Sequence, residues 1–135
     1  MVVLCQEHAA YEKAHYNPNG KRVQLAYHLF SDSPSLQCLV LERRGSVVGY
    51  ATFVKQFSTW EADYYLYLDC LYLEKSVRGQ GWGARLMEKV EEYARAEGYS
   101  TVQWQTPSFN KAAIDFYDKI GARAKSKERF YWDIQ

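Results

Sequence analysis

The sequence predicts an α/β protein in which helices cover both faces of a mixed, mostly antiparallel, twisted sheet. Two observations carry this prediction. Residues 36–42 and 47–57 are β-rich runs joined by the turn Arg44-Gly45-Ser46, which is typical of an antiparallel hairpin. A third β-rich run, residues 64–73, leads through glycines into a helical pattern, so strands and helices alternate in the second half of the chain.

Two helices are expected before the strands. Residues 1–14 place Leu4, His8 and Tyr11 on one helical face, and an Asn-Pro-Asn-Gly cluster ends this pattern. Residues 21–30 form the second helical pattern. Its apolar side is expected to consist of Leu25, Ala26, Leu29 and Phe30.

The strand at 64–73 is nearly continuous in apolar and aromatic residues, which predicts a central position in the sheet. Asn110 is a plausible N-cap for a helix that follows it in the chain. The remaining elements are expected to be a helix, a strand, a helix and a last strand, at residues 84–97, 100–105, 111–120 and 129–134.

Composition limits the class of protein. A chain of 135 residues suggests one domain over 1–135, and its net charge of +1 lacks the basic surface that nucleic acid requires. The three cysteines form no disulfide framework, and no apolar stretch is long enough to span a bilayer. We therefore expect a cytoplasmic protein without nucleic-acid or membrane partners. His8, His15 and His28 show no metal-ligand spacing, so no metal is expected.

The most informative stretch is Arg-Gly-Gln-Gly-Trp-Gly at residues 78–83. A strand that turns through glycines into a helix presents free N–H groups and a positive dipole end to an anion. A diphosphate-bearing cofactor is the first hypothesis, although ordinary turn chemistry explains glycine clusters equally well from spacing alone. The spacing matches neither the nucleotide P-loop nor the Gly-x-Gly-x-x-Gly of a dinucleotide fold.

Arg78, Gly81 and Gly83 resemble the acetyl-CoA signature of the GNAT superfamily of N-acetyltransferases, Arg/Gln-x-x-Gly-x-Gly/Ala. Downstream, Asn110 and the run from Phe116-Tyr117 to Gly-Ala resemble a second feature of that family, in the same order and spacing. The resemblance covers roughly residues 36–134 and implies a GNAT-type fold. Members of the family usually open with a strand before the first helix, and the sheet of this chain is expected to be without that strand. We therefore expect a bare sheet edge at 36–41, covered by another segment or paired in a homodimer.

The resemblance implies acetyl-CoA as co-substrate and assigns tasks to individual residues. Backbone groups of Leu71 and Leu73 would pair with the pantetheine arm, which requires two strands to splay apart at a bulge near Asp69-Cys70. Asn110 would touch the same arm. The diphosphate would be held by the loop and the first helical turn: Arg78, Gly79, Gln80, Gly81, Trp82, Gly83 and Ala84.

Tyr117 would give a proton to the leaving thiolate, because a phenol suits that task. The alternative is a core tyrosine at helical spacing from Ala113 and Ile120. Trp82 is more readily explained by packing than by catalysis. No base accompanies Cys70, so direct transfer without an acyl-enzyme is expected.

An alkylamine must lose a proton before it attacks a thioester, and a nearby carboxylate can take that proton. Asp69 is the candidate, because a lone carboxylate in an apolar strand is costly; the alternative is that it faces solvent or pairs with a lysine. Leu68-Asp69 resembles a Leu-Glu pair of the spermidine/spermine and thialysine acetyltransferases, and Tyr11-Glu12 resembles their first helix. The resemblance implies a polyamine, diamine or thialysine-like acceptor bound by Asp69, Tyr11 and Glu12.

Two other functions stay open at this point. One is acetylation of protein or peptide amines, which would need an open groove. The other is a non-enzymatic acyl-CoA-binding module. The intact loop beside Tyr117 and Asp69 argues against the second, and the missing first strand argues mildly for it.

Overall fold

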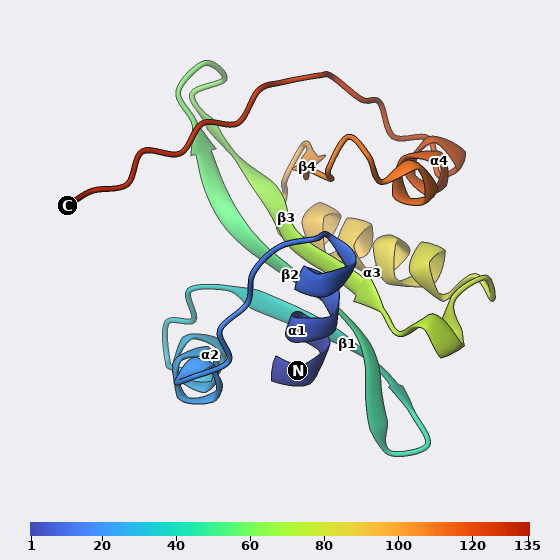
Figure 1. Cartoon of the computed structure of the whole chain (residues 1–135). Helices are drawn as coiled ribbons and strands as arrows, with labels where there is room; N and C mark the ends of the chain where they lie inside the picture. Colours follow the sequence, from blue (N-terminus) through green and yellow to red (C-terminus); the bar gives the residue numbers. More distant parts are fainter. The chain divides into compact units, whose positions relative to one another are not determined.

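The computed structural model describes all residues from Met1 to Gln135, and the chain divides into two compact units, Met1–Gln105 and Thr106–Gln135. The single domain expected over 1–135 stays a prediction. The second unit contains one helix, α4 (Lys111–Lys119). The elements of the first unit are, in chain order, α1 (Val2–Tyr11), α2 (Lys21–Phe30), β1 (Gln37–Arg43), β2 (Ser46–Ser58), β3 (Asp63–Leu73), the 3₁₀ turn η1 (Lys75–Val77), α3 (Trp82–Ala96) and β4 (Val102–Gln103) (Figure 1).

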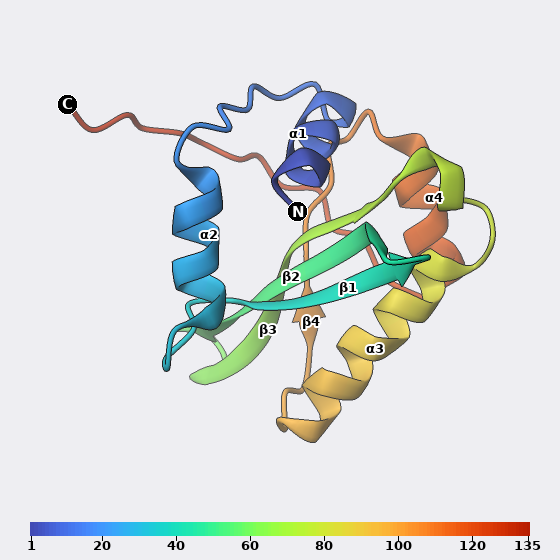
Figure 2. The same cartoon turned by 90° about the horizontal axis from the view of Figure 1, so that it is seen from below.

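The sheet has the order β1-β2-β3-β4, with antiparallel pairs except between β3 and β4, which run parallel. The predicted hairpin is confirmed: Arg44 and Gly45 have φ of 51° and 79°, as a two-residue turn with the twist of a hairpin requires. Figure 2 shows α1 and α2 on one side of the sheet and α3 on the other. The predicted fold class, a mixed sheet with helices on both faces, is confirmed, and β3 lies inside the sheet as expected.

Each face of the sheet has its own packing. On the α1 side, Leu4 is buried against Tyr50 and Tyr72. On the α3 side, the rings of Phe53 and Tyr93 lie 4.8 Å apart, and the helix buries Leu86, Met87, Val90 and Ala94. Gly49 allows β2 and β3 to approach closely, because a Cβ there would lie 2.5 Å from Leu73 Cδ2.

A β-bulge interrupts the pairing of β2 with β3. Thr52 pairs with Cys70 and the next residue, Phe53, pairs with Leu68, so Asp69 has no partner in β2. The bulge predicted near Asp69-Cys70 is confirmed. A bulged residue disrupts the ladder and redirects the strand, which places Asp69 at an irregular point of an otherwise regular sheet.

The structure corrects several expected boundaries. The helix expected from residue 84 begins at Trp82, because Gly81 takes the left-handed conformation of its N-cap. The strand expected at 100–105 is reduced to Val102–Gln103. On α2, Leu25 and Leu29 are half-buried as expected, but Ala26 and Phe30 are exposed.

The prediction of a last strand at residues 129–134 is wrong. No strand forms there, and the side chains of Phe130, Tyr131, Trp132 and Ile134 are exposed. Apolar alternation supplies the side chains of a strand but not the neighbouring backbone with which a strand must pair. None of the helices combines the length and the hydropathy needed to cross a bilayer.

Candidate active site

The loop between β3 and α3 holds its shape through backbone angles. Gly79 and Gly81 have φ of 74° and 83°, in the left-handed region that residues with a Cβ seldom adopt. A Cβ built on either glycine would meet nothing within 4 Å. Glycine is therefore required here by conformation rather than by packing, and the backbone of the loop is open to an approaching group.

The N-terminus of α3 is uncapped by side chains. The first helical hydrogen bond of α3 is donated by Arg85 N to Gly81 O, at 3.1 Å. The N–H groups of Trp82, Gly83 and Ala84 therefore precede the ladder, and the first turn has neither a side-chain cap nor an acidic residue. The positive end of a 15-residue helix is left without a neutralising group from its own turn, which favours binding of an anion.

Arg78 joins this loop to the helix on the other side of β3. Its Nε donates a hydrogen bond to Leu73 O at 2.8 Å. Its guanidinium lies 4.8 Å from the ring centre of Tyr11 and 5.2 Å from that of Tyr72. The predicted cation at the start of the loop is thus also a clamp between the end of β3 and α1. The side chain of Gln80 donates to Ser76 O at 3.3 Å, and Trp82 is partly exposed.

The backbone of β3 changes its direction of hydrogen bonding at the bulge. Before the bulge, Leu66 N donates to Thr101 O at 3.1 Å, so the backbone N–H and C=O groups of even-numbered residues point toward β4. After the bulge, Glu74 N donates to Val48 O at 2.8 Å, so the backbone groups of even-numbered residues point toward β2. Because backbone groups alternate along a strand, Leu71 and Leu73 direct their N–H and C=O groups away from β2.

No strand pairs with that side of β3 where Leu71 and Leu73 lie, although Leu73 O accepts the hydrogen bond from Arg78. The strand pairs with β4 only at Leu66 and Tyr67. Beyond these residues the two strands do not pair, as the predicted splay requires. The bulge at Asp69 therefore has a definite effect: it turns two backbone positions toward the unpaired side of the strand.

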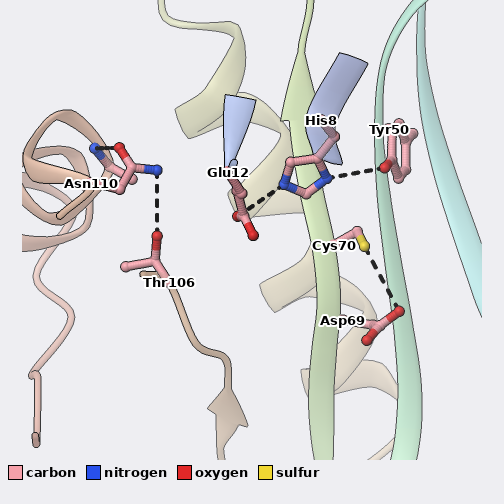
Figure 3. Close-up of polar contacts among 8 residues, drawn as sticks. His8, Glu12, Tyr50, Asp69, Cys70, Thr106 and Asn110 are labelled. Atoms are coloured by element: carbon pink, nitrogen blue, oxygen red, sulfur yellow. Dashed lines mark hydrogen bonds and ion pairs between the residues drawn. The ribbon is translucent and has the colours of Figure 1, made fainter. Parts of the chain in front are cut away.

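A network of polar side chains links α1 to the sheet (Figure 3). The imidazole of His8 lies between Glu12, with Nε2 3.1 Å from Oε1, and Tyr50, with Nδ1 3.1 Å from the hydroxyl oxygen. The ring stacks on that of Tyr72 with centres 5.2 Å apart. Tyr72 in turn donates to Glu7 at 3.5 Å. The expected substrate residue Glu12 thus belongs to a network that extends into the core.

Asp69 is exposed on the bulge, so its carboxylate faces solvent and is not buried in the strand. Its role as a base stays a prediction. Its Oδ2 lies 3.7 Å from Cys70 Sγ (Figure 3). Burial, and then the charge of Asp69, raise the pKa of Cys70 to about 12. The thiol is therefore protonated at neutral pH and unsuited to nucleophilic attack, in agreement with direct transfer.

In the second unit, Asn110 is buried and caps α4. Its side chain accepts a hydrogen bond from Ala113 N at 3.2 Å, so the predicted N-cap is confirmed, and its amide donates to Thr106 Oγ1 at 3.5 Å (Figure 3). Tyr117 is half-buried on α4, with its ring centre 5.3 Å from that of Phe116. The proton transfer expected of Tyr117 and the cofactor contact expected of Asn110 stay predictions.

The sequence did not single out His8, Tyr50 and Tyr72. One signal for His8 was present, because a histidine and a glutamate four residues apart face each other on a helix. Tyr50 lies 42 residues from His8, and no local pattern joins the two. The structure gathers no group of three or more His, Cys, Asp or Glu side chains that could hold a metal ion.

Comparison with known proteins gives the class. The model of the acetyltransferase (GNAT) family matches residues 3–122, and the chain belongs to this family. Thialysine N-epsilon-acetyltransferase of Bos taurus is 32% identical over 128 residues, which cover 89% of this chain and 75% of that protein. Spermidine/spermine N(1)-acetyltransferase-like protein 1 of Homo sapiens is 26% identical over 106 residues, 73% of this chain and 15% of that protein.

Solved structures show the same fold. A crystal structure of an aminoglycoside acetyltransferase from an uncultured soil metagenomic sample matches with a TM-score of 0.80 at 18% identity, over 99% of this chain and 86% of that one. The protein is thus an N-acetyltransferase of the GNAT family, whose members use acetyl-CoA as donor, and the predicted resemblance is confirmed.

Proposed function

We propose that the protein transfers an acetyl group from acetyl-CoA to a primary amine of a small polyamine, diamine or thialysine-like molecule by direct attack. The observation that carries the proposal lies in β3. There an exposed carboxylate, Asp69, stands at a bulge immediately before two backbone positions on an unpaired side of the strand, Leu71 and Leu73. The similarity to thialysine N-epsilon-acetyltransferases supports the choice of acceptor.

The donor end of the site is built from main chain. The uncapped N–H groups at the start of α3 suit a diphosphate, and the open backbone of the loop lets it approach. Leu71 and Leu73 suit an extended, amide-containing arm, which can pair with them as a strand would. Acetyl-CoA supplies the acetyl group as a thioester, and an N–H of β3 would polarise its carbonyl oxygen.

The acceptor end is built from carboxylates. Asp69 would take a proton from the incoming ammonium group, which frees the nitrogen lone pair for attack on the thioester carbon. Glu12 and the aromatic ring of Tyr11, at the C-terminal end of α1, would hold the remaining part of a cationic acceptor. As the carbon–sulfur bond breaks, Tyr117 would give its proton to the departing sulfur, and the second proton lost by the nitrogen would restore the phenol. Each turnover releases one proton, because an ammonium ion becomes a neutral amide while the thiol is formed.

A homodimer and a cytoplasmic location belong to the same proposal. The β1 edge of the sheet is unpaired, and Val40 on it is exposed, which suits pairing with a second copy of the chain. All three cysteines are free, which suits a reducing compartment. Light scattering across a concentration series would test the dimer.

The test is release of free thiol from acetyl-CoA across a panel of thialysine, spermidine, short diamines and lysine-containing peptides. We expect release with small amines, and a fall in kcat of about 100-fold or more in Tyr117→Phe, the low end of what a lost general acid costs. Tyr131→Phe, at an exposed tyrosine of the same unit, is the matched control. Release with peptides only would contradict the proposed acceptor, and tight CoA binding without release on any amine would contradict the activity.

A further inference from the structure

The helix α2 carries apolar side chains on two opposite sides. Leu25 and Leu29 are half-buried on one side of the helix. The opposite side, the outer stripe, has the helical spacing i, i+3, i+4, i+7 and consists of Val23, Ala26, Tyr27 and Phe30. Val23, Tyr27 and Phe30 are 71%, 68% and 84% exposed. A helix that is apolar on both sides is normally covered on both, so the outer stripe indicates a contact surface.

Little within α2 itself stabilises this helix. Its N-cap is Gly20, without a side-chain hydrogen bond, and its first turn has no acidic residue. Lys21 and Arg22 open the helix, although cations at the positive end of a helix dipole are unfavourable. No residue of α2 is buried, and an isolated helix of ten residues is marginal in water. Packing on the outer stripe would supply the stability that the local sequence does not.

The outer stripe is complementary to a second copy of itself. In an antiparallel pair of α2 helices, a twofold axis between Ala26 and Tyr27 brings Val23 of one copy to Phe30 of the other. The same axis brings Ala26 of each copy to Tyr27 of the other. Both contacts set a smaller side chain against a larger one, which fills the space between two helices. A surface that meets itself in this way forms a closed dimer.

The same arrangement compensates the unfavourable charges at the start of α2. Antiparallel helices place the positive end of each dipole beside the negative end of the other. The last helical hydrogen bond of α2 runs from Ser31 N to Tyr27 O at 3.1 Å, and the carbonyl groups of Leu29 and Phe30 lie beyond it. Arg22 flanks the outer stripe and would lie beside these carbonyl groups of the second copy. Each helix thus stabilises an end of the other.

Tyr27 is held in position on the outer stripe. Its ring lies edge-on to the imidazole of His28, with centres 5.2 Å apart. Nδ1 of His28 in turn lies 2.8 Å from the hydroxyl oxygen of Ser35, and Ser35 N donates to His28 O at 3.0 Å. An aromatic side chain that is already ordered loses little conformational entropy on association, which is typical of the residues that carry the affinity of an interface.

We propose that two copies of the protein associate through the outer stripe of α2, as an antiparallel helix pair about a twofold axis. The inference rests on the homodimer of the proposed function, for which it names the contact surface, and does not depend on the acetyl transfer. The edge strand β1 offers one exposed large apolar side chain, Val40, whereas the outer stripe offers three. These three would bury roughly 400 Å² per copy, which is below a standard interface and predicts a dimer in the micromolar range.

A short helix with aromatic residues and cations can also lie on an anionic membrane. Such helices carry lysine and arginine along their polar side, whereas Lys21 and Arg22 both stand in the first turn of α2. The outer stripe therefore suits a second copy better than a membrane surface, and vesicle binding is one outcome of the test.

Sedimentation equilibrium across a concentration series tests the contact. Wild type should dimerise with a micromolar Kd, and Phe30→Glu should raise that Kd about 30-fold or more, the effect of losing a central aromatic contact. Trp60→Glu, at a tryptophan that is 94% exposed between β2 and β3, is the matched control and should leave the Kd unchanged. Val40→Glu, on the β1 edge, should also leave it unchanged. Circular dichroism checks that each variant is folded.

Disulfide cross-linking tests the axis. Ala26 stands beside the proposed twofold axis, so Ala26→Cys should form a covalent dimer under a mild oxidant. Lys21→Cys is the matched control on the same helix, because Lys21 would lie roughly 16 Å along the pair from its copy, too far for a disulfide. Wild type, whose three cysteines are half-buried, gives the background.

The outcomes separate this inference from the proposed function. A dimer that survives Phe30→Glu, whether or not Val40→Glu dissociates it, or equal cross-linking of the two cysteine variants, would overturn the role of α2 and leave a homodimer standing. A wild type that stays monomeric at every concentration would overturn both the contact and the homodimer, and its binding to phosphatidylserine vesicles would assign the outer stripe to a membrane. A dimer that releases no thiol with any amine overturns the acetyl transfer alone.

Discussion

The two ends of the candidate site differ in their functional groups: one end offers main-chain groups and the other offers side chains. The donor end, from Leu71 along the loop to Ala84, offers main-chain N–H and C=O groups whose directions are set by strand parity, by positive φ at Gly79 and Gly81, and by the start of α3. The acceptor end offers side chains from separate segments: His8 from α1, Glu12 from the C-cap of α1, Tyr50 from β2 and Asp69 from β3.

This difference predicts different responses to substitution. A main-chain site tolerates exchange of its side chains but not a change of backbone angle. A side-chain site tolerates changes of neighbouring backbone turns but not the loss of a functional group. The substitutions below test this contrast.

The largest effect is expected at Asp69. Asp69→Asn keeps the size of the side chain and removes the base, so kcat/KM for the amine acceptor should fall at least about 100-fold at neutral pH, while the affinity for CoA stays the same. Asp32→Asn, at an exposed aspartate before the sheet, is the control. A loss below about threefold in Asp69→Asn would remove Asp69 from the proton transfer.

The second effect concerns the reactivity of Cys70. Because its pKa is raised to about 12, only a small fraction of the thiol is ionised at pH 8, and iodoacetamide should label Cys70 about 100-fold more slowly in the folded protein than in urea. The rate should increase about tenfold per pH unit up to that pKa, because ionisation limits it. Peptide mass spectrometry measures both rates. Fast labelling of Cys70, or an acetylated Cys70 during turnover, would contradict direct transfer.

A smaller effect is expected at the backbone of the loop. Gly81→Val imposes a β-branched side chain at φ 83° and should weaken CoA binding about 30-fold by calorimetry, from about 2 kcal/mol of backbone strain and lost hydrogen bonds. Gly98→Val imposes the same strain at φ 81° just beyond the other end of α3. Gly98→Val should cost comparable stability and leave CoA affinity unchanged. Equal losses of affinity in both variants would mean that Gly81 acts through stability alone.

The smallest effect is expected for the side chains of the same loop. Gln80→Ala and Trp82→Phe leave the main chain in place, so each should change CoA affinity less than about twofold. Calorimetry under the conditions used for Gly81→Val gives the comparison. A tenfold loss in either variant would show that a side chain, rather than the main chain, holds the donor at this point.

Much of the donor end could be predicted from the sequence because its determinants are local. A glycine loop between a strand and a helix specifies free N–H groups whatever surrounds it. The boundary was two residues late, since Gly81 rather than Gly83 is the N-cap, and that depends on backbone angles which a glycine-rich run leaves open. The family resemblance supplied the predicted location of the pantetheine arm and the predicted role of Tyr117.

The acceptor end was predicted only in part. Asp69 and Glu12 were named, but the contact of His8 was not predicted, because its partner Tyr50 is 42 residues away in the chain. The last strand failed for a related reason. Residues 129–134 have a pattern suited to a sheet, yet a strand exists only where another backbone pairs with it, and the sequence does not specify that neighbour.

The sequence by itself determined the helices, the hairpin of β1 and β2, the turns and the place where an anion can meet free N–H groups, because these depend on residues close together in the chain. The tertiary structure decided which way β3 presents its backbone after the bulge and which side chains of α1 meet the sheet. Those outcomes follow from register and packing between distant segments, which local residue preferences do not fix.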